Sequence, residues 1–327
     1  MARSRKLEDT LDALAELRRQ PQSAATTIQL REAIGAKASA VVAKAARIAG
    51  DLEIDELVPE LRTAFHRLLV NPVKSDPGCA AKTEIASALH RMGVHEEALF
   101  LAGIRHVQRE PVWGGSVDTA SELRVACAHG LVRLGHPDAH DEIAELLADP
   151  EPAARSGAAR AIAYSEDGRL APLLRLKILG GDAESQVIAD CLAALLRVAP
   201  VGALELCARL LDRGDAARSE TVALALGESR LRSALPVLRA WWERTVTLDL
   251  RRIALLAIAL LRTEDAQAFL LEIIAGAPGH DARDAIAALG VFRDDEALLA
   301  RLVAAAEARD DVDLRSALAP LTGKGKR

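Results

Sequence analysis

An internal repeat constrains the fold of this 327-residue chain more than any other feature of its sequence. One set of segments aligns as helices with small residues where a neighbouring backbone must approach: 80–93, 121–135, 152–165, 185–199, 217–229, 249–263 and 280–292. A second set has apolar residues at helical spacing: 140–149, 170–180, 203–212, 234–244, 266–276 and 296–307. The two sets alternate, so each period is expected to hold one helical hairpin.

Equivalent points in the helices that end at 135, 165, 199, 229, 263 and 292 are separated by 30, 34, 30, 34 and 29 residues. The joints LADPEP, LGGDAE and LDRGDA carry Asp, Gly or Pro, which end one helix and cap the next. Half of the residues are hydrophobic but only 2% are aromatic, so Leu, Ala, Val and Ile must form the interior. These features predict an all-α fold, a right-handed α-solenoid (superhelix) of antiparallel helical hairpins without β-sheet.

An acidic residue followed shortly by arginine begins most helices of the first set. The pairs are Asp149 with Arg155, Asp215 with Arg218, Asp249 with Arg251, Asp281 with Arg283, and Asp313 with Arg315. Over roughly residues 37–320 the chain resembles the HEAT-repeat family, in its short bacterial form of about 30 residues related to the phycobilisome-lyase repeats. The resemblance implies that these pairs form a structural ladder between hairpins and that the second helix of each pair lines the concave face. It implies no particular function, because HEAT arrays have many unrelated roles.

The ends of the chain differ from the repeats. Residues 1–36 are interpreted as an N-terminal capping helix, with its charged amphipathic stretch at 6–20, and a linker. The repeat array is expected over 37–322, with about eight hairpins, and 323–327 as a flexible tail.

Two intervals near the N-terminus are longer than the rest. Gly50, Gly93 and Gly135 are separated by 43 and 42 residues, and the extra residues fall at 67–82 and 104–122. Stacked repeats place equivalent loops side by side, so both insertions are expected on one edge of the solenoid. They would then form one composite surface.

This surface is the predicted partner-binding site. Its hypothetical anchor is Trp113, and its polar surround is Arg105, His106, Lys74 and Asp76. A tryptophan in a Gly/Pro-containing loop either packs back onto the helices, as a structural residue, or remains accessible and anchors a partner. The sequence leaves both readings open.

No residue set in the sequence indicates catalysis, a metal or a cofactor. The di-iron hydroxylases of this architecture need several His-Glu pairs, whereas the chain has only His95-Glu96. Cys127 and Cys191 lie among small apolar residues, where inert buried thiols are expected. The scattered cysteines show no CxxC pair, and we expect free thiols in a reducing cytoplasm.

The leading interpretation is a cytoplasmic, non-catalytic scaffold or adaptor that binds another, unidentified protein through the concave face, the loop edge, or both. A net charge of −5 disfavours a nucleic-acid partner, and the sequence has no membrane segment. The alternative is a HEAT-like enzyme, either an alkylpurine glycosylase type acting on nucleic acid or a chromophore-lyase-like protein. Trp241 and Trp242, close to several arginines, are the residues that support the glycosylase reading.

Overall fold

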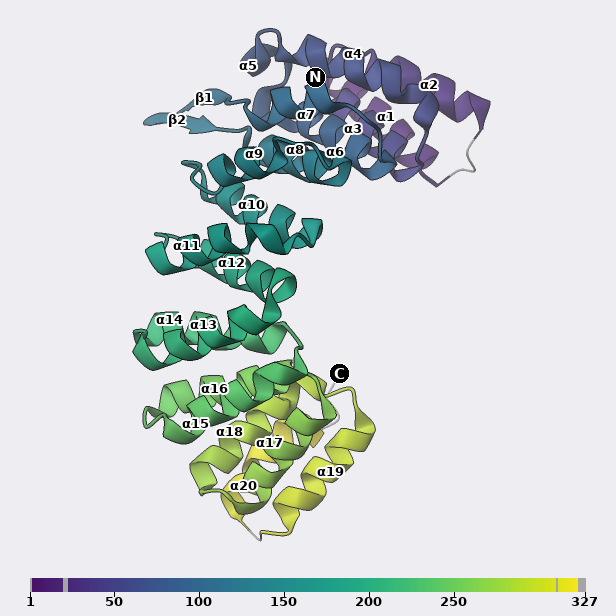
Figure 1. Ribbon diagram of the computed structural model, residues 1–327. Helices are drawn as coiled ribbons and strands as arrows, with labels where there is room; N and C mark the ends of the chain where they lie inside the picture. The colour runs from purple at the N-terminus through teal and green to yellow at the C-terminus, as the bar shows by residue number, and fades with distance from the viewer. Residues whose placement is uncertain (1, 20–22, 310, 323–327) are drawn as a thin grey trace. The chain divides into compact units, whose positions relative to one another are not determined.

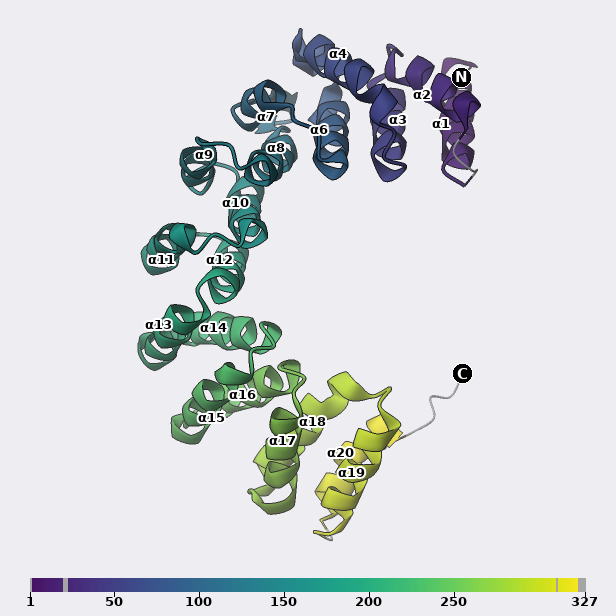
Figure 2. The same ribbon diagram turned by 45° about the vertical axis from the view of Figure 1, so that its right-hand side comes forward.

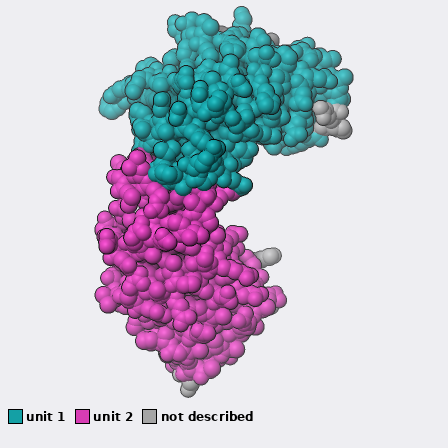
Figure 3. Space-filling model, in the orientation of Figure 1, with its two compact units in different colours: residues 1–173 teal, residues 174–327 magenta. Residues whose placement is uncertain are grey.

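The computed structural model describes residues 2–19, 23–309 and 311–322, most of them in helices. The helices pack as antiparallel hairpins, which confirms the predicted all-α solenoid. The chain divides into two compact units, residues 1–173 and 174–327, and each is described by itself (Figure 3). The tail expected at 323–327 lies outside the described residues.

Unit 1 begins with helices that the repeat pattern identified only in part. Its α-helices are α1 (Ala2–Leu17), α2 (Ala24–Ile34), α3 (Ser39–Asp51), α4 (Val58–Leu69), α5 (Pro72–Ser75), α6 (Ala80–Met92), α7 (Glu97–Ile104), α8 (Ser121–Leu134), α9 (Ala139–Leu146) and α10 (Pro152–Ser165). Three short 3-10 helices are η1 (Asp55–Leu57), η2 (Pro77–Cys79) and η3 (Gly168–Leu170). Residues 24–34, within the N-terminal region expected to hold a capping helix and a linker, form α2, which packs on α3 and α4.

Unit 2 follows the repeat more regularly. Its α-helices are α12 (Ser185–Val198), α13 (Pro200–Arg213), α14 (Ala216–Glu228), α15 (Leu235–Arg244), α16 (Leu248–Leu260), α17 (Glu264–Gly276), α18 (Gly279–Leu289), α19 (Glu296–Glu307) and α20 (Val312–Thr322). The 3-10 helices are η4 (Arg232–Ala234) and η5 (Gly290–Phe292), and α11 (Ala171–Gly180) contains the boundary between the units. Helices α12, α14, α16 and α18 pack one on the next in an inner row, with α13, α15 and α17 behind them (Figure 2).

Small residues allow the inner helices to approach closely. A Cβ atom added to Gly227 of α14 would lie 2.4 Å from the carbonyl oxygen of Ala257 in α16. The two backbones therefore meet at a distance that only glycine permits. The core around such contacts consists of buried Leu, Ile and Ala side chains, as the composition predicts.

One part of the fold contradicts the expected absence of β-sheet. Strands β1 (Arg109–Val112) and β2 (Gly115–Asp118) form an antiparallel hairpin within the second insertion. This hairpin projects away from the helices of unit 1 (Figure 1). The repeat pattern is silent about it because the hairpin does not belong to the repeating unit.

The arginine ladder connects repeats, but its partners differ from those that the sequence indicated. In unit 2, Arg251 donates from Nε and Nη2 to the carboxylate of Asp281 at 3.0 and 2.7 Å, and Asp281 is buried. In unit 1, Arg124 donates from Nη2 to Asp149 at 3.0 Å. Each arginine thus pairs with the aspartate at the start of the next inner helix.

The other expected pairs are corrected as follows. Arg155 donates to the carbonyl groups of Asp149 and Pro150, while the carboxylate of Asp149 faces Arg124. The side chain of Asp215 caps α14 through the N–H of Arg218 at 2.8 Å.

Three further ladder residues also have other partners. The guanidinium of Arg218 caps α11 at the carbonyl of Ile178. Asp249 pairs with Arg252, and exposed Arg283 donates to the carbonyl of Gly279 in its own helix. Helix capping and inter-repeat contact are the observed interactions, with partners that differ from those the sequence indicated.

Candidate partner-binding site

Trp113 lies at the tip of the β-hairpin. It forms a two-residue turn with Gly114, whose φ of 87° belongs to the left-handed region that favours glycine. The Trp113 side chain is fully exposed, at 101% of its reference area. It therefore does not pack back onto the helices, and of the two readings of this residue the geometry matches an accessible side chain.

The base of the hairpin is held by Asp118. Its carboxylate accepts hydrogen bonds from the backbone N–H groups of Gln108 and Ala120, both at 3.0 Å, and from Arg124 Nη1 at 2.8 Å. Burial raises the pKa of Asp118, but these hydrogen bonds and the charge of Arg124 outweigh it and lower the pKa below its ordinary value. The buried guanidinium of Arg124 thereby connects the hairpin to the ladder of unit 1.

The first insertion lies against the second. Gln108 is almost fully buried, and its Nε2 donates to the carbonyl of Asp76 at 2.8 Å and to Glu110 Oε1 at 2.7 Å. The N–H of Gly78 donates to the same Glu110 oxygen at 2.6 Å, and Thr119 Oγ1 does so at 2.9 Å. Burial raises the pKa of Glu110, but the hydrogen bonds prevail and lower it. The expectation that the two insertions share one edge is met by these contacts.

Asp76 does not belong to the exposed surround of Trp113, and that assignment is wrong. Its carboxylate is fully buried and accepts from the backbone N–H groups of Ala81 and Lys82, each at 3.0 Å. The ammonium of Lys82, also fully buried, donates to it at 3.0 Å. Asp76 therefore caps α6 and neutralises a buried lysine, because the free N–H groups of a helix start require acceptors.

The other predicted surround residues have different degrees of access. Arg105 pairs with Glu142 through Nε at 2.8 Å, yet its side chain stays largely exposed. His106 is half-buried beside Gln108, and burial is the main cause that lowers its pKa. Lys74 is exposed on α5. Trp113, Arg105 and Lys74 are thus the accessible members of the set.

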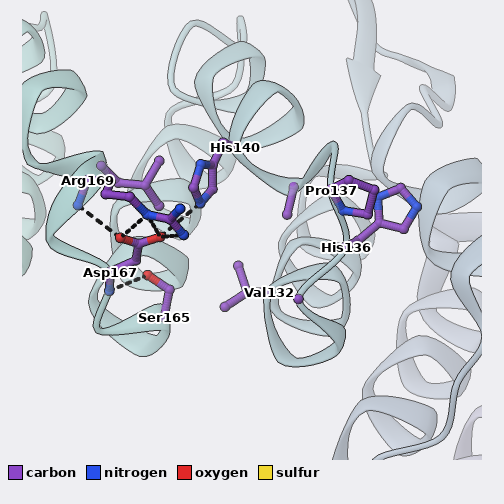
Figure 4. Close-up of a pocket in the computed structure, with 10 residues that line it drawn as sticks. Val132, His136, Pro137, His140, Ser165, Asp167 and Arg169 are labelled. Carbon is purple, nitrogen blue, oxygen red and sulfur yellow. Dashed lines mark hydrogen bonds and ion pairs between the residues drawn. The ribbon is translucent and has the colours of Figure 1, made fainter.

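A cavity of about 400 Å³ in unit 1, which the sequence did not indicate, brings polar side chains together (Figure 4). The carboxylate of Asp167 lies 3.0 Å from His140 Nε2 and accepts a hydrogen bond from Arg169 Nε at 3.0 Å. The hydrogen bonds from Arg169 are the main cause that lowers the pKa of Asp167. Ser165 lies beside them, so the set superficially resembles a Ser-His-Asp triad.

The repeat itself argues against a nucleophilic Ser165. Its hydroxyl donates to the carbonyl of Ile162 at 2.7 Å and accepts from the N–H of Asp167. In unit 2, Ser229 makes the same two bonds, with the carbonyl of Leu226 and the N–H of Leu231. The serine at this position ends a helix in both units, and its proton points to a carbonyl rather than to His140.

The tryptophans that supported a nucleic-acid enzyme are buried. Trp241 and Trp242 are 3% and 9% exposed. The ring of Trp242 packs edge-on against Phe269 and lies under the guanidinium of Arg251, 4.3 Å from its centroid. Neither indole offers an open face on which a base could stack.

All four cysteines are buried and free, as expected for Cys127 and Cys191, and burial raises the pKa of Cys79 to about 11 and of Cys191 to about 12. The described part of the chain contains no cluster of three or more His, Cys, Asp or Glu residues that could hold a metal ion. None of its helices is long and apolar enough to cross a membrane.

Neither a protein-family model nor a curated protein matches this sequence. Among solved structures, the chain is similar to the complex of CpcE and CpcF of phycocyanin lyase from Nostoc, with 18% identity, a TM-score of 0.35, and coverage of 74% of this chain and 93% of that one. It is also similar to human deoxyhypusine hydroxylase, with 16% identity, a TM-score of 0.31, and coverage of 89% and 99%. Similarity at this level transfers neither protein's activity to the chain.

Proposed function

We propose that this chain is a non-catalytic HEAT-type scaffold that binds another protein in the cytoplasm, with Trp113 as the residue that enters the partner. The observation that carries the proposal is the full exposure of Trp113 at the tip of a hairpin. Exposure of an indole to water is unfavourable, and burial of its large apolar surface in a partner therefore stabilises the complex. Tryptophan is also among the residue types that dominate binding free energy at interfaces.

The base of the hairpin supports this role. Buried Gln108 and Arg124, together with Asp118, hold both strands where they leave the helices. A side chain presented on a held element loses less conformational entropy on binding than one on a free loop. Lys74 is also exposed, and its positive charge would favour an acidic partner surface, whereas exposed Arg105 is already paired with Glu142.

The test compares wild-type protein with Trp113→Ala in affinity capture from native lysate, followed by titration with the purified captured partner. Trp113→Ala should weaken binding by at least about 2 kcal/mol. Its melting temperature should stay unchanged, because the indole has no intramolecular packing to lose.

Tyr164→Ala is the matched aromatic control. Tyr164 is 44% exposed on α10 and contacts His90 and His129, so it belongs to the inner helices rather than to the hairpin. Binding should survive this substitution. Loss of binding with Tyr164→Ala and retention with Trp113→Ala would move the site to the inner face.

A further inference from the structure

The hydrogen-bonding register of the hairpin determines which backbone groups face outward. The N–H of Thr119 donates to the carbonyl of Gln108 at 3.0 Å, directly beyond the Arg109–Asp118 pair. In an antiparallel ladder, hydrogen-bonded and non-hydrogen-bonded pairs alternate. Arg109–Asp118 and Pro111–Ser116 are therefore the non-hydrogen-bonded pairs, whose N–H and C=O groups point away from the neighbouring strand.

This register makes the two outer edges of the hairpin unequal. On β1, Pro111 occupies an outward-facing position and has no N–H, so the middle of that edge lacks a donor. On β2, Ser116 occupies the opposite position and offers both an N–H and a C=O group to solvent. The side chains of Gln108, just before β1, and Glu110, within β1, contact the first insertion. The outer edge of β2 is the open one.

The exposed side chains next to this edge are apolar on one face. Glu110, Val112, Gly115 and Val117 share a face because they belong to the hydrogen-bonded pairs. Glu110 accepts a hydrogen bond from Gly78 of the first insertion, whereas Val112 and Val117, nearer the turn, are 47% and 45% exposed. Gly115 leaves room beside Val117 for a side chain from an added strand. The opposite face presents Pro111 and the small polar side chain of Ser116.

We infer that the partner binds by adding an extended segment to the outer edge of β2, with apolar side chains at alternate positions against Val112 and Val117. This inference rests on the proposed function and specifies its partner as a peptide strand. Outward-facing N–H and C=O groups at strand spacing are matched only by another extended backbone, and alternating side chains give such binding its specificity. Trp113 lies in the turn at the end of the hairpin, where its exposed side chain is accessible to such a segment.

The test uses the full-length protein and a phage-displayed library of random short peptides as the probe. Selected peptides should show alternating apolar residues. Ser116→Pro removes the outward donor but not the hairpin's own hydrogen bonds, and it should weaken peptide binding at least about tenfold. Ser116→Ala retains the N–H and should bind like wild type. Equal binding by Ser116→Pro and wild type would overturn the inference.

Amide hydrogen exchange provides a measurement that does not depend on whether Ser116→Pro folds. In the free wild-type protein the Ser116 amide should exchange faster than the Val117 amide, which bonds within the hairpin. Saturating peptide should slow exchange at Ser116 at least about tenfold and leave Val117 nearly unchanged. No protection at Ser116 would refute strand addition.

The outcomes separate this inference from the proposed function. Peptides that lose binding with Trp113→Ala but not with Ser116→Pro would leave Trp113 as the anchor and reject strand addition. If the library yields no binder, strand addition is rejected, and the capture experiment with Trp113→Ala still decides the proposed function. Sedimentation that shows a wild-type dimer and a monomeric Ser116→Pro protein would make a second copy the occupant and overturn the assigned partner.

Discussion

Arg124 in unit 1 and Arg251 in unit 2 occupy the same position, the fourth residue of helices α8 and α16. They share two kinds of contact. Each guanidinium pairs with the aspartate that begins the next inner helix, Asp149 or Asp281. Each also donates to a carbonyl in the segment before its own helix, His106 for Arg124 and Trp242 for Arg251. One arginine thus joins three consecutive segments in both units.

The remaining contacts of the two arginines differ. Arg251 lies over the ring of Trp242, which belongs to the outer helix α15. Arg124 instead pairs with Asp118 at the base of the hairpin, 2.8 Å from its Nη1 atom. The repeat position that fixes an outer helix in unit 2 therefore fixes an inserted hairpin in unit 1. Because the packed repeats hold the base of the hairpin, the hairpin can present a tryptophan at its tip without having a hydrophobic core of its own.

The largest expected effect tests whether the ladder arginine is structural. Arg251→Ala leaves Asp281 buried without its cation, and it should lower the free energy of unfolding by about 3–5 kcal/mol. Arg252→Ala is the matched control, because its pair with Asp249 is exposed and worth at most about 1 kcal/mol. Chemical denaturation measures both. An Arg251→Ala protein with unchanged stability but lost partner binding would reverse the structural assignment.

A second effect tests the close packing onto α16. Gly227→Ala would place a methyl group against the backbone of Ala257, and it should cost about 1–3 kcal/mol of stability. The matched control is Gly202→Ala in α13, where the nearest atom, from Arg175, is 3.7 Å away. That substitution should be neutral or slightly stabilising, because alanine favours helix. Equal melting temperatures for the two variants would show that the α14–α16 contact relaxes freely.

A third effect separates the two roles of Arg124. Asp118→Asn removes the charge at the hairpin base but leaves Asp149 paired with Arg124, so the expected cost is only about 1–2 kcal/mol. Proteolysis at the turn near Trp113 should become faster, because the strands lose their attachment. A loss as large as that of Arg251→Ala would mean that the hairpin is part of the core of unit 1.

The sequence predicted the regular elements of the fold because local signals and the repeat agree there. Residues 152–165 were expected to form a helix and do so as α10, with Pro152 at its first turn. The ladder partners could not be chosen from sequence. Asp149 lies near Arg155 in sequence, yet Arg124 reaches it from the preceding repeat. In a periodic array an aspartate has one arginine close to it in sequence and another in the preceding repeat, and only the packing determines which of the two it contacts.

The insertions were predicted in place, but the contacts within them were not. The long intervals located the insertions, and Trp113 is accessible as one reading required. Asp76 was misassigned because a charged residue in a loop reads as exposed, whereas buried Lys82 and the start of α6 both need its carboxylate. The hairpin has a sequence signal, Val112 and Val117 flanking a turn with two glycines, but Pro111 argues against a strand unless it lies on an edge.

The smallest expected effect is the change in stability at acidic pH. It again contrasts the units, because seven of the eight histidines lie within residues 1–173. His90 packs against His129 and Tyr164, and its Nδ1 is buried without a hydrogen-bond partner among the described residues. Burial, followed by the nearby charges of His129, Arg133 and Arg91, lowers the pKa of His90 from 6.5 to about 4. The folded protein therefore holds His90 neutral.

Between these two pKa values the unfolded chain binds the proton that the folded chain excludes, so the free energy of unfolding falls as pH is lowered from about 6.5 towards 4. Amide exchange at pH 7 and pH 5 should show unit 1 loosening before unit 2. His90→Gln should reduce this difference, whereas His95→Gln, at an exposed position, should leave it in place. An unchanged pH dependence in His90→Gln would mean that another group in unit 1 excludes the proton, and the ring cluster would then contribute packing alone.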